Sequence, residues 1–163
     1  MNQESSLDEK AFAALVSRQR DLLWHLCSTY RFSAAWETED ALQEVLCVLW
    51  HDFGSFDHRS SERTWVFRVA TNTLISLKRR RSNQPQPDGP APVEESGSDE
   101  GLFHLQQLIE TLDDRDYQLV KAHLYGFSHA EIAHMTGSTT AAVAMRLSRI
   151  KKKLKKQYGH EEE

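Results

Sequence analysis

The chain has 163 residues, of which 39% are hydrophobic and 9% aromatic, and its formal net charge at pH 7 is −4. This length suits one ordinary domain or two small ones, and the apolar content is sufficient for packed cores. No window approaches the roughly 20 uninterrupted apolar residues that a membrane-spanning helix needs, and the polar N-terminus MNQESSLDEK lacks a signal-peptide pattern. We therefore predict a globular, cytoplasmic protein without membrane insertion.

Residues 1–81 show helical periodicity and no strand-like alternation of any length. A first helix of about 20 residues is predicted by an apolar stripe made of Phe12, Leu15, Leu22, Leu23, Leu26, Cys27 and Tyr30. A second helix begins near Thr38, a good N-cap. It directs inward Leu42, Val45, Leu46, Leu49, Trp50 and Phe53. Its opposite face carries Asp40, Gln43 and Glu44.

The segment GSFDHRSS contains a glycine and several turn-forming residues, so it ends the second helix. A third helix is predicted from about Ser61 into the basic run KRRR. Its apolar positions are Trp65, Val66, Val69, Leu74 and Leu77. Residues 1–81 therefore form a first helical domain.

Residues 82–101, SNQPQPDGPAPVEESGSDEG, hold all four prolines of the chain and five acids, with no Lys or Arg. Such a composition buries too little apolar surface to offset its ordering entropy, which predicts a flexible acidic linker. The linker separates the first domain from a second domain at residues 102–158, followed by an acidic tail at 159–163. The predicted fold class is all-α, with two small helical domains.

The second domain is predicted to hold four helices. LFHLQQLIETL has apolar residues at helical spacing, and a further helix covers about residues 115–125 until Gly126 ends it. Ser128 and Glu131 have the spacing of a capping box for a short helix, SHAEIAHM. A turn at Thr136 and Gly137 leads to a last helix capped by Ser138 or Thr139. Two helices joined by a tight turn predict a helix-turn-helix.

The last helix has one apolar stripe and a basic end. Its stripe is Val143, Leu147, Ile150 and Leu154. The seven positive charges are Arg146, Arg149, Lys151, Lys152, Lys153, Lys155 and Lys156. A recognition helix places its N-terminal residues against base edges while basic residues neutralise phosphates, so the helix suits the major groove of DNA. The macrodipole by itself also favours cations at a helix C-terminus, so a purely structural role remains open.

Neither metal nor cofactor binding is predicted. HAEIAH superficially resembles the HExxH zinc motif, but His129 and His134 are five residues apart and do not share a helix face. No phosphate-binding loop, nucleophile elbow or catalytic carboxylate spacing appears, so the chain is not expected to be an enzyme. Cys27 and Cys47 form no CxxC pair and are expected to be reduced thiols.

The two domains together resemble a known family. EDALQEVLCVLW, SFD and TWVFRVATNTLISLKRRR are similar to region 2 of bacterial RNA polymerase sigma factors, and the segment from LQQLIETL to SRIKKKL resembles their region 4. With only these two regions, the chain resembles the extracytoplasmic-function (ECF) group. This resemblance implies a factor that binds core RNA polymerase, recognises the minus ten and minus thirty-five promoter elements and helps to open the duplex.

The resemblance also implies roles for individual residues. The β′ clamp helices of the polymerase would contact Asp40, Gln43, Glu44 and Trp50. The minus ten strand would meet Ser55, Phe56, Asp57, Arg59, Arg63, Trp65, Arg68, Asn72, Lys78, Arg79, Arg80 and Arg81. The minus thirty-five element would meet Thr139, Thr140, Ala141, Ala144, Met145, Arg146, Arg149 and Lys152. From the residues themselves, Trp65 suits a packed core equally well, and the acids suit an ordinary solvated face.

Two departures from the family pattern leave the promoter sequence open. Ala141-Ala142-Val143-Ala144-Met145-Arg146 stands where the family commonly has Gly-Thr-Val-Lys-Ser-Arg, and Thr71 and Ser76 replace a usual arginine and aspartate. The family further implies docking of the second domain on the β flap and restraint by an anti-sigma factor. The alternative function is a stand-alone dimeric helix-turn-helix regulator, which would have no need for the first domain.

Overall fold

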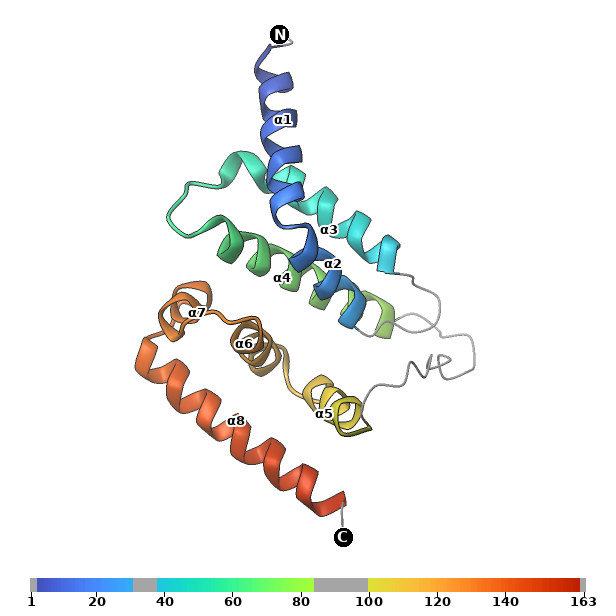
Figure 1. Ribbon diagram of the computed structural model, residues 1–163, viewed down its shortest axis with the longest axis vertical. Coiled ribbons are helices and arrows are strands. Elements are labelled where there is room, and N and C mark those ends of the chain that lie inside the picture. The colour runs from blue at the N-terminus through green and yellow to red at the C-terminus, as the bar shows by residue number, and fades with distance from the viewer. Residues whose placement is uncertain (1–2, 31–37, 84–99, 162–163) are drawn as a thin grey trace. The chain divides into compact units, whose positions relative to one another are not determined.

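The computed structural model describes residues 3–30, 38–83 and 100–161, and in these ranges every regular element is a helix (Figure 1). The predicted all-α class is therefore confirmed. The chain divides into two compact units, residues 1–92 and 93–163. Within the described ranges, no helix combines the length and the apolar character needed to cross a membrane.

The first unit is a small bundle of helices. Its elements are α1 (Gln3–Arg18), α2 (Arg20–Thr29), α3 (Thr38–Asp52), the 3-10 turn η1 (Phe53–Ser55) and α4 (Glu62–Ser82). Helices α2 and α3 pack against each other and against α4. The fully enclosed side chains include Leu15, Leu23, Val45, Leu49, Val66, Phe67 and Leu74. Of the inward positions predicted for the second helix, Val45 and Leu49 are buried, whereas Leu42, Leu46 and Phe53 are only half-buried.

The predicted first helix is wrong in one respect, because the chain bends at Gln19 and forms two helices, α1 and α2. Gln19 has φ −100° and ψ 11°, yet the backbone bonds continue on both sides of it, with N···O distances of 3.0 Å from Gln19 to Leu15 and from Leu23 to Gln19. At the bend, the Arg18 and Gln19 side chains both donate to the carboxylate of Glu62 at the start of α4. The apolar periodicity of the sequence does not predict this polar contact, because it joins residues that are far apart in the chain.

Trp50 also departs from its predicted inward position, since 43% of the residue is exposed. Its ring packs edge-on against Phe12 of α1 at 5.1 Å between centroids and lies parallel to Phe53 at 6.4 Å. The three rings form an aromatic cluster that reaches the surface.

The second unit wraps three short helices around a long one. Its elements are α5 (Glu100–Glu110), α6 (Asp114–Leu124), α7 (His129–Thr136) and α8 (Thr140–Glu161), and α8 packs against the other three. The predicted stripe on the last helix is confirmed, because all four of its members are buried: Val143, Leu147, Ile150 and Leu154. Helix α5 begins within the predicted linker and α8 extends into the predicted tail; residues 84–99, which hold most of that linker, lie outside the described residues.

The turns of the second unit follow the predicted local chemistry. Ser128 and Glu131 form the capping box, with Glu131 N to Ser128 Oγ at 3.1 Å and Ser128 N to the Glu131 carboxylate at 2.7 Å. Gly126 and Gly137 have φ of 83° and 62°, the left-handed conformation that glycine adopts without steric cost. Of the two caps considered for α8, Thr139 is the one used, since its Oγ1 accepts the Ala142 N–H at 3.1 Å. These contacts fix the angle at which α8 leaves α7.

Candidate nucleic-acid interface

The loop between η1 and α4 is organised around an aromatic contact. The ring of Phe56, which is half-buried, stacks on Trp65 with 4.8 Å between centroids and 26° between planes. Trp65 itself is only 4% exposed and lies among the core side chains of α4. Of the two roles that the sequence left open for Trp65, the structure therefore favours the core. Phe56, which stacks on Trp65, is the ring that is partly exposed at the loop surface.

Polar contacts hold the same loop in shape. Asp57 pairs with Arg59 at 2.9 Å between Oδ2 and Nε, and its Oδ1 accepts the backbone N–H of Arg59 at 3.2 Å. Ser55 Oγ donates to the carbonyl of Asp52 at 2.7 Å. At the other end, Ser61 Oγ accepts the backbone N–H of Thr64 at 3.1 Å and so caps α4. The loop is thus fixed at both ends by its own side chains.

Helix α4 presents cations to solvent next to this loop. Arg68, Asn72 and Arg79 are exposed and fall at i, i+4 and i+11, so they share one side of the helix. The exposed residues Arg63, Lys78 and Arg80 project from other sides. Arg81 belongs to α4, but its side chain lies outside the described residues.

One of the family departures in α4 points inward. Thr71 is 1% exposed, and its hydroxyl donates to the carbonyl of Phe67 at 2.8 Å. The other departure, Ser76, is exposed. Thr71 is therefore a core residue whose polar atom is satisfied by its own helix.

The outer face of α3 carries the remaining predicted residues of the first unit. Asp40 and Gln43 are exposed and Glu44 is half-buried. By helical geometry, Gln43 and the exposed Trp50 lie on the same side of α3, with Asp40 and Glu44 beside them. These side chains form one continuous surface along the helix.

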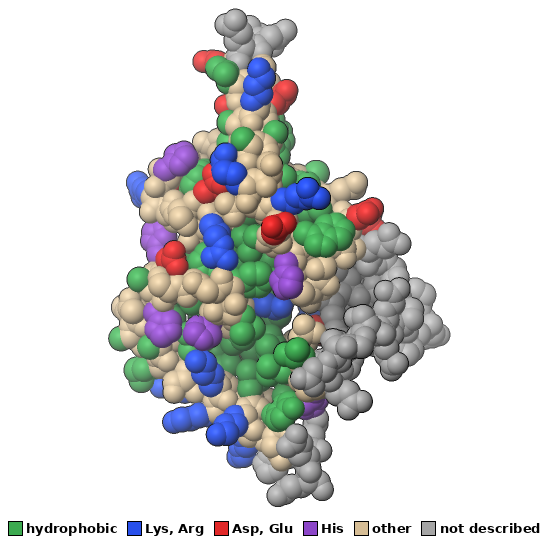
Figure 2. Space-filling view, in the orientation of Figure 1, with side chains coloured by type: hydrophobic (Ala, Val, Ile, Leu, Met, Phe, Trp, Pro, Cys, Tyr) green, Lys and Arg blue, Asp and Glu red, His purple; other side chains and the backbone are tan. Residues whose placement is uncertain are grey.

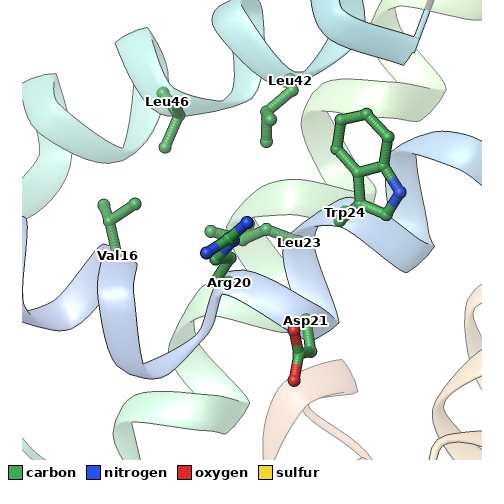
Figure 3. Close-up of a pocket in the computed structure, with 7 residues that line it drawn as sticks. All are labelled: Val16, Arg20, Asp21, Leu23, Trp24, Leu42 and Leu46. Carbon is green, nitrogen blue, oxygen red and sulfur yellow. The ribbon is translucent and has the colours of Figure 1, made fainter.

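An apolar groove that sequence reasoning missed lies beside this surface (Figure 3). It has a volume of about 430 Å³ and is bounded by α1, α2 and α3. Its lining residues are Val16, Arg20, Asp21, Leu23, Trp24, Leu42 and Leu46. Trp24 is 48% exposed, which is unusual for so large an apolar side chain. In the sequence, Trp24 itself could have indicated this groove, because it is a large aromatic residue outside the apolar stripe predicted for the first helix.

In the second unit, the helix-turn-helix of α7 and α8 directs one side of α8 outward. By helical geometry, the positions opposite the buried stripe are Ala141, Met145, Ser148, Arg149 and Lys152, and all are exposed. Thr139 and Thr140 are exposed at the start of the helix, whereas Ala144 is half-buried at its flank. Ser148 was missed by sequence reasoning, although its spacing of seven from Ala141 places it on the same face. Figure 2 shows Lys and Arg side chains along the part of the surface that α8 occupies in Figure 1.

Arg146 differs from Arg149 in its surroundings. Its Nε donates to Asp116 Oδ1 of α6 at 2.6 Å, and Asp113 lies 4.0 Å from Nη2. The Arg146 side chain is 40% exposed and that of Asp116 is 19% exposed. The sequence predicted Arg146 as a DNA contact; the structure shows in addition that it ties α8 to α6.

Burial accounts for the shifted pKa values of Cys27 and His123. Burial raises the pKa of the Cys27 thiol to about 12, so the thiol stays protonated, and both cysteines are free, as expected for reduced thiols. Burial, and after it the charges of Lys151 and His129, lower the pKa of His123. Among the described residues, no group of three His, Cys, Asp or Glu side chains is placed to hold a metal ion.

Comparison with known proteins matches both units. Residues 15–84 match the family Sigma-70 region 2, and residues 102–154 match Sigma-70, region 4. The chain is 26% identical over 161 residues to the RNA polymerase sigma factor NccH of Alcaligenes xylosoxydans xylosoxydans, covering 90% of this chain and 86% of NccH. It is 33% identical over 103 residues to the ECF RNA polymerase sigma factor SigW of Bacillus subtilis, a match that spans 63% of this chain and 51% of SigW.

Two solved structures share the fold. CnrH in complex with the cytosolic domain of CnrY aligns with a TM-score of 0.66 and 22% identity, covering 93% of this chain and 90% of that one. The sigma factor RpoE in complex with the anti-sigma factor NepR, from Bartonella quintana, aligns with a TM-score of 0.65 and 20% identity, covering 90% and 96%. The family matches to region 2 and then region 4, which together span most of the chain, and the similarity to ECF sigma factors show that this chain belongs to the sigma-70 family as a sigma factor of the ECF group.

Proposed function

We propose that this sigma factor binds core RNA polymerase in the cytoplasm, and that each of its two units contacts one promoter element. The observation that supports this most strongly is the pairing, in one chain, of an aromatic loop beside a cationic helix with a basic helix-turn-helix. The first surface suits an unpaired strand and the second suits duplex DNA. The factor itself carries out no chemical step, because the polymerase synthesises the RNA.

The first unit would hold the opened minus ten strand. Single strands are bound by cationic grooves and by stacking of exposed bases on aromatic rings. The loop offers Phe56, fixed by Trp65, with Ser55 and Asp57 beside it, while α4 and the loop supply the cations. The proposed strand-binding set is Ser55, Phe56, Asp57, Arg59, Arg63, Arg68, Asn72, Lys78, Arg79, Arg80 and Arg81. Trp65 acts from the core, as the support of Phe56.

The second unit would place α8 in the major groove of the minus thirty-five element. The N-terminal half of its outward face is apolar, with Ala141 and the 59% exposed Met145, and thymine methyl groups are the matching base feature. Arg149 and Lys152 follow on the same face and would contact phosphates. Thr139 and Thr140 at the helix start and Ala144 at its flank complete the proposed contact set, while Arg146 reaches the DNA only with the atoms that Asp116 leaves available.

Core polymerase would bind the outer face of α3. The proposed contacts are Asp40, Gln43, Glu44 and Trp50, to which the structure adds the neighbouring apolar groove at Trp24, Leu42 and Leu46. An apolar patch rimmed by charged residues is typical of a protein-protein interface. We assign this face to the β′ clamp helices and a surface of the second unit to the β flap.

An anti-sigma factor is a further proposed partner. Support comes from the two solved structures of similar fold, which were determined with NepR and with the cytosolic domain of CnrY. An inhibitor that covered the groove at Trp24 would compete with core polymerase for the same apolar surface.

Reconstituted transcription tests the proposal. Core polymerase is incubated with a promoter library, with and without the purified protein, and the expected result is run-off RNA only when the protein is present. Trp24→Glu should prevent assembly with core polymerase, whereas Ser5→Glu on the exposed side of α1 should not. Tight binding to free duplex without any binding to core polymerase would instead establish the stand-alone regulator.

A further inference from the structure

His58, in the loop between η1 and α4, has an uncommon backbone conformation. Its φ is 57°, and it is the one non-glycine residue with positive φ among those that the structure describes. A side chain at Cβ makes the left-handed region unfavourable, and residues held there cluster at functional sites. This conformation therefore needs stabilising contacts, and it marks His58 as a candidate functional residue.

The cause lies in the two neighbours of His58. Asp57 accepts the backbone N–H of Arg59 across His58 at 3.2 Å and pairs with the Arg59 side chain at 2.9 Å. This closes a tight turn with His58 at its centre. The turn brings the imidazole onto the ring of Phe56, with 4.3 Å between centroids and 45° between planes. His58 is thus held in place by a polar turn on one side and an aromatic contact on the other.

The result is a series of three rings that runs from the core to solvent. Trp65 is buried, Phe56 is half-buried and stacks on it, and His58 is exposed and contacts Phe56. The ring that this series presents to solvent is therefore the imidazole, with much of Phe56 already covered.

We propose that His58 is a specificity-determining residue, whose exposed imidazole is the surface on which an unpaired base of the opened strand stacks. This inference rests on the function proposed above. Every base has a flat π face, so stacking gives affinity, while the imidazole nitrogens can distinguish the edges of neighbouring bases. The side chain of Arg59, which is 82% exposed, lies one residue away and supplies a cation for the adjoining phosphate.

Holoenzyme binding to single strands tests the proposal. Fluorescent oligonucleotides with the non-template sequence of an active promoter are prepared as a set, each with one abasic position. Wild-type holoenzyme should show one position at which base removal weakens binding about 5-fold or more, as expected for loss of one base-aromatic stack. His58→Gly deletes the ring and adopts positive φ without strain, so this variant should bind the intact strand as weakly as wild type binds that abasic strand.

Two variants complete the design. His58→Phe keeps a stacking ring without nitrogens, so it should retain the affinity and lose the preference among bases at the positions next to the stacked base. His25→Ala removes an exposed imidazole from α2 and should leave every affinity unchanged. Equal melting temperatures for His58→Gly and wild type would show that the loop variant is folded.

The inference is overturned if no abasic position affects wild type, if His58→Gly keeps the full abasic effect, or if it binds the intact strand more tightly than wild type. The last result would mean that the imidazole blocks Phe56 instead of extending it. Failure of the proposed function is distinguishable, because holoenzyme assembly and sigma-dependent run-off RNA would then be absent for wild type itself.

Discussion

At the scale of single residues, Arg146 and Arg149 look equivalent in the sequence but differ in the structure. Arg149 is exposed on the outward face of α8, whereas Arg146 is half-buried and bonded to Asp116. A charge-assisted bond of this kind restrains the guanidinium and neutralises part of its charge. The two side chains should therefore affect DNA binding and folding to different degrees.

Arg149→Ala should weaken promoter binding and lower the salt dependence, because one phosphate contact is lost. The slope of log K against log salt is expected to fall by about 1. Fluorescence anisotropy over a range of salt concentrations measures it. Lys10→Ala, which removes the same charge from the exposed side of α1, is the matched control and should leave the slope unchanged.

Arg146→Ala should instead reduce stability, because the carboxylate of Asp116 is left without its partner. We expect a loss of about 1 kcal/mol for this partly exposed pair. Urea unfolding of wild type, Arg146→Ala, Asp116→Ala and the double variant gives the coupling energy. Additive losses would show that the 2.6 Å contact contributes nothing to folding.

At the scale of elements, two contacts set the direction of helices. Glu62 joins the bend between α1 and α2 to the start of α4 through Arg18 and Gln19. In the other unit, Gly137 sets the turn between α7 and α8. Neither the Glu62 contacts nor the Gly137 turn belongs to an apolar core. Each nevertheless sets the direction of a helix that carries a proposed binding surface.

Glu62→Gln should lower the free energy of unfolding of the first unit by about 0.5 kcal/mol at neutral pH, since the Arg18 pair is partly exposed. The hydrogen bond from Arg18 is the main cause that lowers the pKa of Glu62 in the folded state. The contribution is therefore fully present above the ordinary value of 4.5 and is lost as pH falls below it through the lowered pKa. Chemical denaturation of both proteins between pH 7 and pH 3 should show the two stabilities converging on the acid side.

Gly137→Ala should destabilise the second unit by about 1 kcal/mol, because alanine is strained at φ 62° even though no atom lies within 4 Å of the added Cβ. Gly159→Ala is the matched control, since it lies within α8, also has open space, and should stabilise the helix. Thermal unfolding measures both. A melting temperature that fell equally in the two variants would contradict the backbone explanation.

At the scale of the whole molecule, specificity depends on two units in one chain. Once one unit is bound, the connection raises the effective concentration of the other, so two weak contacts act as one strong one. A protease site placed within residues 84–99 allows the units to be separated after purification. Cleavage should reduce promoter binding by the holoenzyme on the order of 100-fold, while each unit keeps its helical circular dichroism signal.

Uncut protein carrying the inserted site is the control for that experiment and should bind the promoter as wild type does. Full transcription by the cleaved protein would show that core polymerase holds each unit independently. The proposal that both units act through a single chain would then be wrong, although the family assignment would stand.

Much of this protein could be predicted from its sequence, because the signals are local. Helical periodicity gave the buried stripe on α8, and the spacing of Ser128 and Glu131 gave the capping box, since both depend on residues a few positions apart. The order of SFD, TWVFRVATN and the helix-turn-helix identified the family. The residue assignments for DNA and polymerase stay predictions that the experiments above address.

Only the tertiary structure decided what depends on residues far apart in the chain. It placed Trp65 in the core beneath Phe56, bent the first helix at Gln19 toward Glu62, and joined Arg146 to Asp116 thirty residues away. Sequence spacing cannot encode these contacts, because each forms only when separate helices pack and desolvate the same polar or aromatic group. The sequence by itself therefore determined the family and the helical class, while packing determined where the first helix bends and which side chains are exposed on the surfaces that we propose for DNA.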